Sequence, residues 1–425
     1  MSVPLWIVLF ASLATAVLFG LILVIFARSE KEITQRVEHL YAVSDPQFLR
    51  SMGVLLGPAL VSGNRIDTLL NGNQIFPAML AAIRTAEKTI TFETYIYWSG
   101  NIGKMFVETL SQKARQGVQI HVLLDWVGSQ KMEQSAIQTM RDAGIQVEKY
   151  HPLEWYTWRR LNNRTHRKIL VVDGKIGFTG GVGIADEWNG DAEGPDNWRD
   201  THYRIEGPVV AQLQSAFMDN WTKLTGDVLH GSAYFPELKE EGLYQAQVFK
   251  SSREGGAESM HLMYLLAIAA AKKSIHLSMA YFVPDDLAVK AIVAALARGV
   301  SIQILLPGQY IDKALVRSAS RGTWGALLAA GAEIFEFQPT MFHCKVLVVD
   351  ELWVSVGSTN FDNRSFKLND ESNLNVYNQQ FAERQLADFR ADLARAKRIT
   401  FQEWQNRPWK EKAQEHILEI VQSQL

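Results

Sequence analysis

The sequence contains almost no cysteine and carries almost no net charge. A single cysteine, Cys344, among 425 residues cannot form an intrachain disulfide, which excludes a disulfide scaffold and a paired-cysteine zinc or redox site. With 43 Lys+Arg against 45 Asp+Glu, the formal net charge is −2, which argues against a strongly basic nucleic-acid coat protein. Hydrophobic residues make up 47% of the chain, so disorder is excluded, and this length predicts two lobes with separate cores.

Charge is also absent from residues 3–27, which contain no ionisable side chain. A helix over this run would be roughly 37 Å long at about 1.5 Å per residue, enough to cross a hydrocarbon core of about 30 Å. A cleaved signal peptide is the alternative, but the run lacks a basic start and exceeds the usual apolar length of about 7–15 residues. Arg28, Lys31 and Arg36 follow the run and no Lys or Arg precedes it. This asymmetry predicts a single-pass anchor in the cell inner membrane, with the remaining chain in the cytoplasm.

The two halves of the remaining chain repeat the same order of patterns at an offset of about 180 residues. The matching segments are residues 76–98 with 260–283, 113–126 with 295–308, and 141–152 with 329–339. Helix-like segments alternate with apolar strands, which predicts an α/β fold of two similar sandwich lobes. Two unrelated α/β domains would not explain the repeated order.

The repeat and the changes of composition predict the boundaries of the domains. We expect an anchor at 1–28, a juxtamembrane segment at 29–62, a first lobe at 63–236, a Gly- and Glu-rich linker at 237–256, a second lobe at 257–405 and an amphipathic tail at 406–425. Such a tail usually packs on its own domain, and contact with the membrane is the less favoured alternative.

Each half contains one copy of the spacing H-x-K-x4-D. The residues are His166, Lys168 and Asp173 in the first copy and His343, Lys345 and Asp350 in the second. Because side chains alternate along a strand, the His and Lys of one copy share a face and the Asp lies on the other. We therefore expect His and Lys to meet one ligand. The dipeptide Asp173-Gly174 is typical of a hairpin turn, so the aspartate is expected to order the turn or a neighbouring main-chain group.

A His and a Lys placed two residues apart suit an anionic phosphorus centre. Lysine donates to the phosphate oxygens, and imidazole attacks phosphorus or carries a proton. Two such units supply a nucleophile and an acid/base with no metal or other cofactor. Zinc ligation is disfavoured, because each motif offers one His beside a Lys cation. A surface-strand histidine would explain a single copy, but two copies at matching places of a repeat argue against it.

This duplicated motif, followed after six residues by a glycine turn, resembles the signature of the phospholipase D superfamily. Together with the apolar N-terminal run, it resembles the bacterial cardiolipin synthases, and the resemblance extends over essentially the whole chain after about residue 64. It implies that the two lobes share one active site at their interface and that substrate phosphorylates one motif histidine. It implies that the catalytic residues are His166, Lys168, Asp173, His343, Lys345 and Asp350.

The resemblance also implies residues that contact the phosphate. In the second half these are Ser358 and Asn360, polar groups that follow the glycine turn. The corresponding positions of the first half are Gly181 and Gly183, which depart from the family pattern. We expect these two glycines to offer main-chain N–H groups to phosphate instead.

Carboxylates are expected to orient the histidines. Glu371 follows His343 by 28 residues and is similar to the family's carboxylate that hydrogen-bonds the motif histidine and fixes its tautomer. Asp200 is the candidate that supports His166, with Asp196 as the alternative. This expectation keeps each carboxylate with the histidine of its own half.

The activity implied by the resemblance is a ping-pong phosphatidyl transfer that makes cardiolipin from phosphatidylglycerol through a phosphatidyl-histidine, with His166 as the expected nucleophile. Phospholipids and the membrane are the expected partners. Hydrolysis of phospholipids is the alternative within the same chemistry. A nuclease would be expected to display a basic groove, so nucleic acid is not expected. An inactive membrane scaffold would not need two intact His-Lys pairs.

Overall fold

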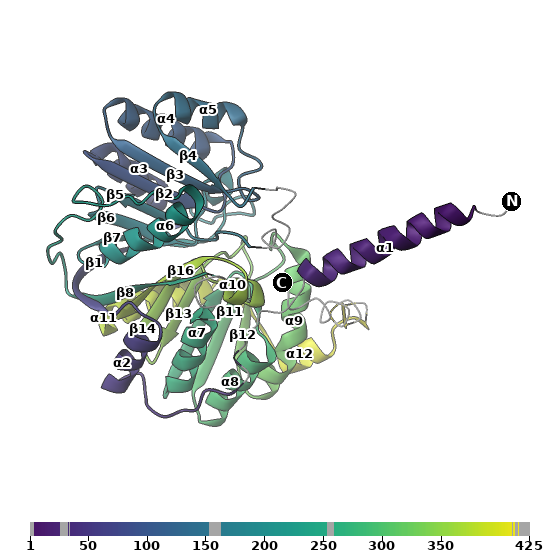
Figure 1. Ribbon diagram of the computed structural model, residues 1–425. Coiled ribbons are helices and arrows are strands. Elements are labelled where there is room, and N and C mark those ends of the chain that lie inside the picture. Colours follow the sequence, from purple (N-terminus) through teal and green to yellow (C-terminus); the bar gives the residue numbers. More distant parts are fainter. Residues whose placement is uncertain are drawn as a thin grey trace.

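The computed structural model describes residues 4–25, 33, 35–152, 163–252, 259–409, 411–412 and 415. Figure 1 shows two lobes, with helix α1 (Leu5–Ile25) extending away from them. Across these described residues, no helix is both long enough and apolar enough to cross a membrane. The anchor expected at 1–28 therefore stays a prediction. Most of the expected tail at 406–425 lies outside the described residues.

The first lobe follows the short helix α2 (Pro46–Leu55). Its elements are β1 (Val61–Leu70), α3 (Asn71–Thr85), β2 (Thr89–Thr94), α4 (Asn101–Arg115), β3 (Gln119–Asp125), α5 (Gln134–Asp142), β4 (Gln146–Tyr150), β5 (Ile169–Val172), β6 (Ile176–Gly180), the 3-10 helix η2 (Asp186–Trp188), β7 (Thr201–Glu206) and α6 (Val210–Thr225).

The second lobe repeats this order with a few additions. Its elements are β8 (Tyr244–Ser251), α7 (Ser259–Ala270), β9 (Ser274–Met279), β10 (Phe282–Val283), α8 (Asp286–Ala297), β11 (Ser301–Pro307), α9 (Ala314–Ala329), β12 (Glu333–Phe337), β13 (Lys345–Val349), β14 (Trp353–Gly357), β15 (Phe361–Asp362), α10 (Asn363–Lys367), β16 (Glu371–Tyr377), α11 (Gln379–Leu393), β17 (Ala396–Ile399) and α12 (Phe401–Gln405).

Within the described chain, fifteen strands join in one sheet whose two halves have the same topology. From the junction outward, the strand order is β1-β7-β6-β5-β2-β3-β4 in the first lobe and β8-β16-β14-β13-β9-β11-β12 in the second, where β17 adds an edge. Strands β1 and β8 pair antiparallel at the junction. The internal repeat predicted from the sequence is therefore confirmed as a repeat of structure.

The expected linker at 237–256 differs from what the structure shows, because strand β8 lies within it. This strand pairs antiparallel with β16 from Gln245 to Ser251. Its side chains Ala246 and Val248 are buried in the core between the lobes. The Gly- and Glu-rich residues before and after β8 dilute the short apolar pattern, which explains why composition alone indicated a linker.

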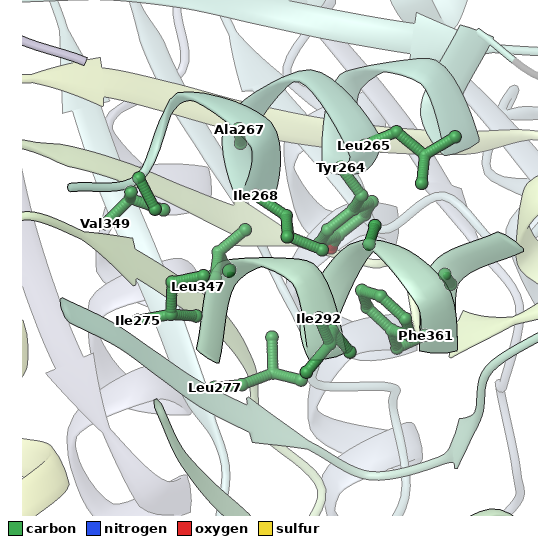
Figure 2. Packing of buried hydrophobic residues seen from close by; sticks show 14 of the residues in the cluster. Tyr264, Leu265, Ala267, Ile268, Ile275, Leu277, Ile292, Leu347, Val349 and Phe361 are labelled. Carbon is green, nitrogen blue, oxygen red and sulfur yellow. The ribbon is translucent and has the colours of Figure 1, made fainter. Parts of the chain in front are cut away.

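Three large hydrophobic cores lie between the layers of the described chain. Helices α3, α4 and α5 pack on the outer face of the first-lobe sheet, and α7, α8 and α9 pack on that of the second lobe. Figure 2 shows the core of the second lobe, in which Ile268 of α7 lies near Leu347 of β13 and Ile292 of α8 lies near Leu277 of β9. Helices α6 and α11 fill the third core, between the two halves of the sheet. This central layer holds the lobes together and positions the site at their interface.

Candidate active site

The two motif histidines line the same cavity, which has a volume of about 520 Å³ and is walled by residues of both lobes. His166 lies three residues before β5, and His343 lies two residues before β13. Both strands are central in their lobes and fully buried, so the histidines extend from rigid positions. The expectation of a shared pocket between the lobes is therefore matched by the geometry.

Each histidine is hydrogen-bonded by a carboxylate from the opposite lobe. The Nδ1 atom of His166 lies 3.0 Å from both carboxylate oxygens of Glu371, and Nδ1 of His343 lies 2.7 Å from Oδ2 of Asp200. This exchange corrects the expected pairing within each half, and Asp196, the alternative, is exposed. Because an ionised carboxylate only accepts hydrogen bonds, each Nδ1–H donates to its carboxylate, and this fixes the tautomer of the ring.

Main-chain bonds between the lobes explain the exchange. The N–H of His166 donates to the carbonyl of Asp370 (2.9 Å), and the N–H of His343 donates to the carbonyl of Arg199 (2.7 Å). Asp370 and Arg199 each immediately precede the orienting carboxylate residue of their own lobe. Each segment that carries a carboxylate therefore lies against the motif of the other lobe, and the side chains meet across the interface.

The motif lysines lie beside the histidines and are buried. Nζ of Lys168 donates to the carbonyl of His166 (2.7 Å), and Nζ of Lys345 donates to that of His343 (2.6 Å) and lies 3.3 Å from its Nε2. Burial lowers the pKa of Lys168 to about 7 and also lowers the pKa of Lys345. Two such groups beside the two histidines suit the oxygens of a phosphate diester.

The two histidine–carboxylate pairs differ electrostatically. Burial, followed by the charges of the motif lysines, holds the pKa of His166 well below its ordinary value, and burial raises the pKa of Glu371 to about 7. Burial and Lys345 also lower the pKa of His343, but the charge of Asp200 opposes them. Although burial opposes it, His343 and Lys345 together lower the pKa of Asp200. The first pair therefore combines a neutral imidazole with a carboxylate of raised pKa, whereas in the second pair the carboxylate stays ionised.

The carboxylates are held by different donors in the two lobes. In the second lobe, the Ser358 hydroxyl donates to Glu371. In the first lobe, glycine occupies the matching position, and a Cβ on Gly181 would lie 2.2 Å from Oδ1 of Asp200. The indole N–H of Trp188 donates to Oδ2 of Asp200 instead (2.9 Å). Sequence reasoning missed Trp188, although the loss of the serine was a signal that another donor was needed.

The four residues expected around the phosphate are used in different ways. Asn360 lines the cavity, and its buried Oδ1 has no hydrogen-bond partner in the described part of the chain. Ser358 is used in holding a carboxylate. The N–H of Gly181 donates to the carbonyl of Thr201 (3.0 Å), and a Cβ on Gly183 would lie 2.8 Å from the Ile96 side chain. The expectation that Gly181 offers its N–H to phosphate is thus wrong, because the main-chain bond to Thr201 of β7 occupies that N–H.

The motif aspartates lie in the hairpins at the far ends of the motif strands. Each has a φ of 53°, as a tight hairpin turn requires. Their carboxylates accept main-chain N–H groups of Glu87, Lys88 and Thr89 for Asp173, and of Lys272, Lys273 and Ser274 for Asp350. Neither is among the described residues that line the cavity. This confirms the role in ordering the turn and neighbouring main chain, and it corrects the catalytic role implied by the resemblance, since the aspartates point away from the histidines' end of the strand.

Comparison with known proteins identifies the family. The family model described as cardiolipin synthase, PLD-like domain, matches residues 79–219 and 264–393, which together contain both motifs. The chain belongs to this phospholipase D-like family. Curated relatives in it include cardiolipin synthase of Geobacillus kaustophilus, 35% identical over 91% of this chain and 77% of the relative, and cardiolipin synthase A of Pseudomonas fluorescens, 34% identical over 88% and 77%.

Solved structures share the fold of this cardiolipin synthase-like chain. The crystal structure of phosphatidylserine synthase of Haemophilus influenzae has a TM-score of 0.66 at 13% identity and covers 89% of this chain and 100% of its own. The duplicated two-lobe architecture is therefore that of the phospholipase D-like fold. Within the described residues, no group of three or more His, Cys, Asp or Glu side chains is arranged to hold a metal ion.

Proposed function

We propose that this protein is a membrane-anchored phosphatidyltransferase that makes cardiolipin from two molecules of phosphatidylglycerol. The observation that carries the proposal is the pair of histidines on one cavity, each with its Nδ1 hydrogen-bonded to a buried carboxylate of the opposite lobe. Relatives named cardiolipin synthase, similar over most of the chain, support the choice of substrate class.

In the first half-reaction, His166 is the nucleophile. Its lowered pKa keeps the ring neutral, so Nε2 can attack the phosphorus of the first phosphatidylglycerol. The bond between phosphorus and the glycerol oxygen breaks as His343 gives a proton to that oxygen, and glycerol leaves. The phosphatidyl group is then bonded to His166, and Glu371 stabilises the positive ring. Lys168 and Lys345 neutralise charge on the phosphate oxygens in the transition state.

In the second half-reaction, His343 acts as a base. It removes a proton from the primary hydroxyl of a second phosphatidylglycerol, whose oxygen attacks the phosphorus. The bond from phosphorus to Nε2 of His166 breaks, cardiolipin leaves and both histidines return to their starting states. One phosphodiester replaces another, so the reaction consumes no nucleotide. Aromatic side chains in the cavity wall, those of Tyr95, Trp98, Trp188 and Trp198, support transfer because they limit the access of competing water.

The membrane anchor is part of the proposal. The uncharged run over residues 3–27 is long enough to span a bilayer, and the lysine and arginine residues that follow it favour a cytoplasmic catalytic part in the inner membrane. The projection of α1 away from the lobes is consistent with that arrangement (Figure 1). The orientation can be tested with a reporter enzyme that is active on only one side of the membrane. Fused to either terminus, it shows on which side that terminus lies. A C-terminus on the outer side would contradict it.

The activity can be tested with the purified full-length protein in detergent and phosphatidylglycerol as the sole lipid. Cardiolipin and glycerol formed in equal amounts are the expected products. Phosphatidic acid instead of cardiolipin would show hydrolysis and overturn the transferase. Unchanged lipid, under conditions in which a known cardiolipin synthase is active, would overturn both enzymatic proposals.

A further inference from the structure

Cardiolipin formation brings two phosphodiesters to one site, and only one of them reacts. In the proposed function, the reacting phosphate is placed between the histidines, and the phosphate of the acceptor lipid remains one glycerol unit away. Both histidine–lysine pairs are assigned to the reacting phosphate. A separate cation at the cavity rim would bind the second and would distinguish an acceptor phospholipid from water or a neutral alcohol.

Lys313 occupies such a position. It lies just before helix α9, is exposed at the rim and lines the cavity together with both histidines. Its charge contributes to lowering the pKa of His166, which places it within electrostatic reach of the reacting phosphate without hydrogen-bonding the histidine. A rim cation at that range suits an anion that is held near the reaction centre but does not react.

The loop that carries Lys313 is fixed by Tyr281. The Tyr281 hydroxyl donates to both carboxylate oxygens of Asp312, at 2.8 and 2.7 Å. The ammonium of Lys313 lies 5.6 Å from the centroid of the same ring. A single aromatic residue therefore positions two successive rim residues, and the lysine is placed before any lipid binds.

The internal repeat supplies a comparison. Lys131 of the first lobe lies between β3 and α5, as Lys313 lies between β11 and α9, and it also lines the cavity. Its ammonium lies 3.7 Å from the centroid of the Trp98 ring, much closer than Lys313 lies to Tyr281. The first-lobe lysine is thus already engaged by an aromatic face, whereas the second-lobe lysine has more freedom to meet an anion.

We propose that Lys313 binds the unreacting phosphate of the acceptor phospholipid and so favours lipid transfer over other fates of the phosphatidyl-enzyme. The inference rests on the proposed function and names the acceptor subsite of that same cavity. The ligand is a phosphodiester anion carried by a lipid that also presents a primary hydroxyl. The loss of one charge-assisted bond predicts about a tenfold effect on use of this acceptor.

A competition experiment tests this choice of acceptor. Full-length protein in mixed micelles receives phosphatidylglycerol together with monoacylglycerol, a neutral lipid that also has a primary hydroxyl. The measured quantity is the ratio of cardiolipin to phosphatidyl-monoacylglycerol, which does not depend on how much of the enzyme is active. In Lys313→Gln the ratio is expected to fall about tenfold, and Lys313→Arg is expected to restore most of it. Lys290→Gln, at an exposed position of α8 away from the cavity, is the matched control.

The outcomes separate this inference from the proposed function. A wild-type protein that makes neither product would refute the function itself. A wild-type protein that makes both, with an unchanged ratio in Lys313→Gln, would overturn the acceptor subsite alone. An equal fall in Lys313→Gln and Lys290→Gln would also overturn it, because the effect would then be a general attraction of anionic lipid.

Discussion

Glu371 of the second lobe accepts a hydrogen bond from Nδ1 of His166 in the first lobe, and both of its carboxylate oxygens lie 3.0 Å from that nitrogen. Asp200 of the first lobe does the same for His343 of the second. Neither lobe therefore contains a complete histidine–carboxylate pair, although each contains a complete sequence motif. The interface between the lobes is a part of the catalytic apparatus, and its assembly decides whether either imidazole has a fixed tautomer.

The exchanged pairing predicts which histidine responds to which carboxylate. In Glu371→Gln, the ring nitrogens of His166 should change their NMR chemical shifts and titration, while those of His343 should stay close to wild type. Asp200→Asn is the matched variant and should give the reverse pattern. Each variant should lose about 100-fold or more in kcat, because acid–base and nucleophilic chemistry depend on the tautomer. A response of His343 to Glu371→Gln would contradict the exchange.

The buried charges predict a narrow pH optimum near neutrality. Burial raises the pKa of Glu371 to about 7, so below that pH the protonated carboxyl no longer holds His166. Burial lowers the pKa of Lys168 to about 7, so above that pH the lysine loses the charge that the phosphate needs. The hydrogen bond from Ser358 lowers the pKa of Glu371, and Ser358→Ala should therefore move the acid limb of kcat/KM to higher pH. A shift of the acid limb to lower pH would refute this assignment.

Much of this fold could be predicted from the sequence because the sequence contains an internal repeat. The matched order of helices and strands gave the two lobes, and the identical spacing gave both histidines. The pairing of Asp200 with His343 could not be predicted in the same way, since it depends on how one lobe is rotated onto the other. Local patterns carry no information about that rotation. Trp188 was missed for a related reason. Its indole N–H donates to Asp200 as the Ser358 hydroxyl donates to Glu371, but the two residues lie at different places in the repeat.

Trp188→Phe tests whether the indole N–H positions Asp200. The ring centroids of Trp188 and His343 are 5.3 Å apart. Phenylalanine keeps an aromatic ring beside His343 but removes the hydrogen bond to Asp200. We expect kcat to fall about tenfold with little change in KM, because the loss of one hydrogen bond to a buried charged group costs about 1.5–3 kcal/mol. An altered His343 titration in the NMR spectrum would show the effect passing through Asp200. A fall in thermal stability with an unchanged titration would mean that the tryptophan only packs.

The hairpin aspartate should matter for stability and little for chemistry. Asp173→Asn weakens three main-chain hydrogen bonds that join the hairpin to the start of β2 and the two residues before it. We expect the free energy of unfolding to fall by about 2 kcal/mol, measured by chemical denaturation in detergent, while kcat at a permissive temperature stays within a few-fold of wild type. His166→Ala should behave in the opposite way, with a stable fold and no turnover. A stable but inactive Asp173→Asn protein would restore the aspartate to the chemistry.

The order of the two histidines can be decided by trapping. With a phosphatidyl ester of p-nitrophenol, the leaving group needs no proton, so attack on phosphorus can proceed without a general acid. In His343→Ala, His166 should then take up the phosphatidyl group, and the adduct should persist because no base activates the hydroxyl that would remove it. Mass spectrometry of the peptide containing His166 should show the added mass, and His166→Ala should show none on His343. An adduct on His343 in His166→Ala, with none on His166 in the reciprocal variant, would exchange the two roles, since the nucleophile must be the residue that forms the bond when its partner is removed.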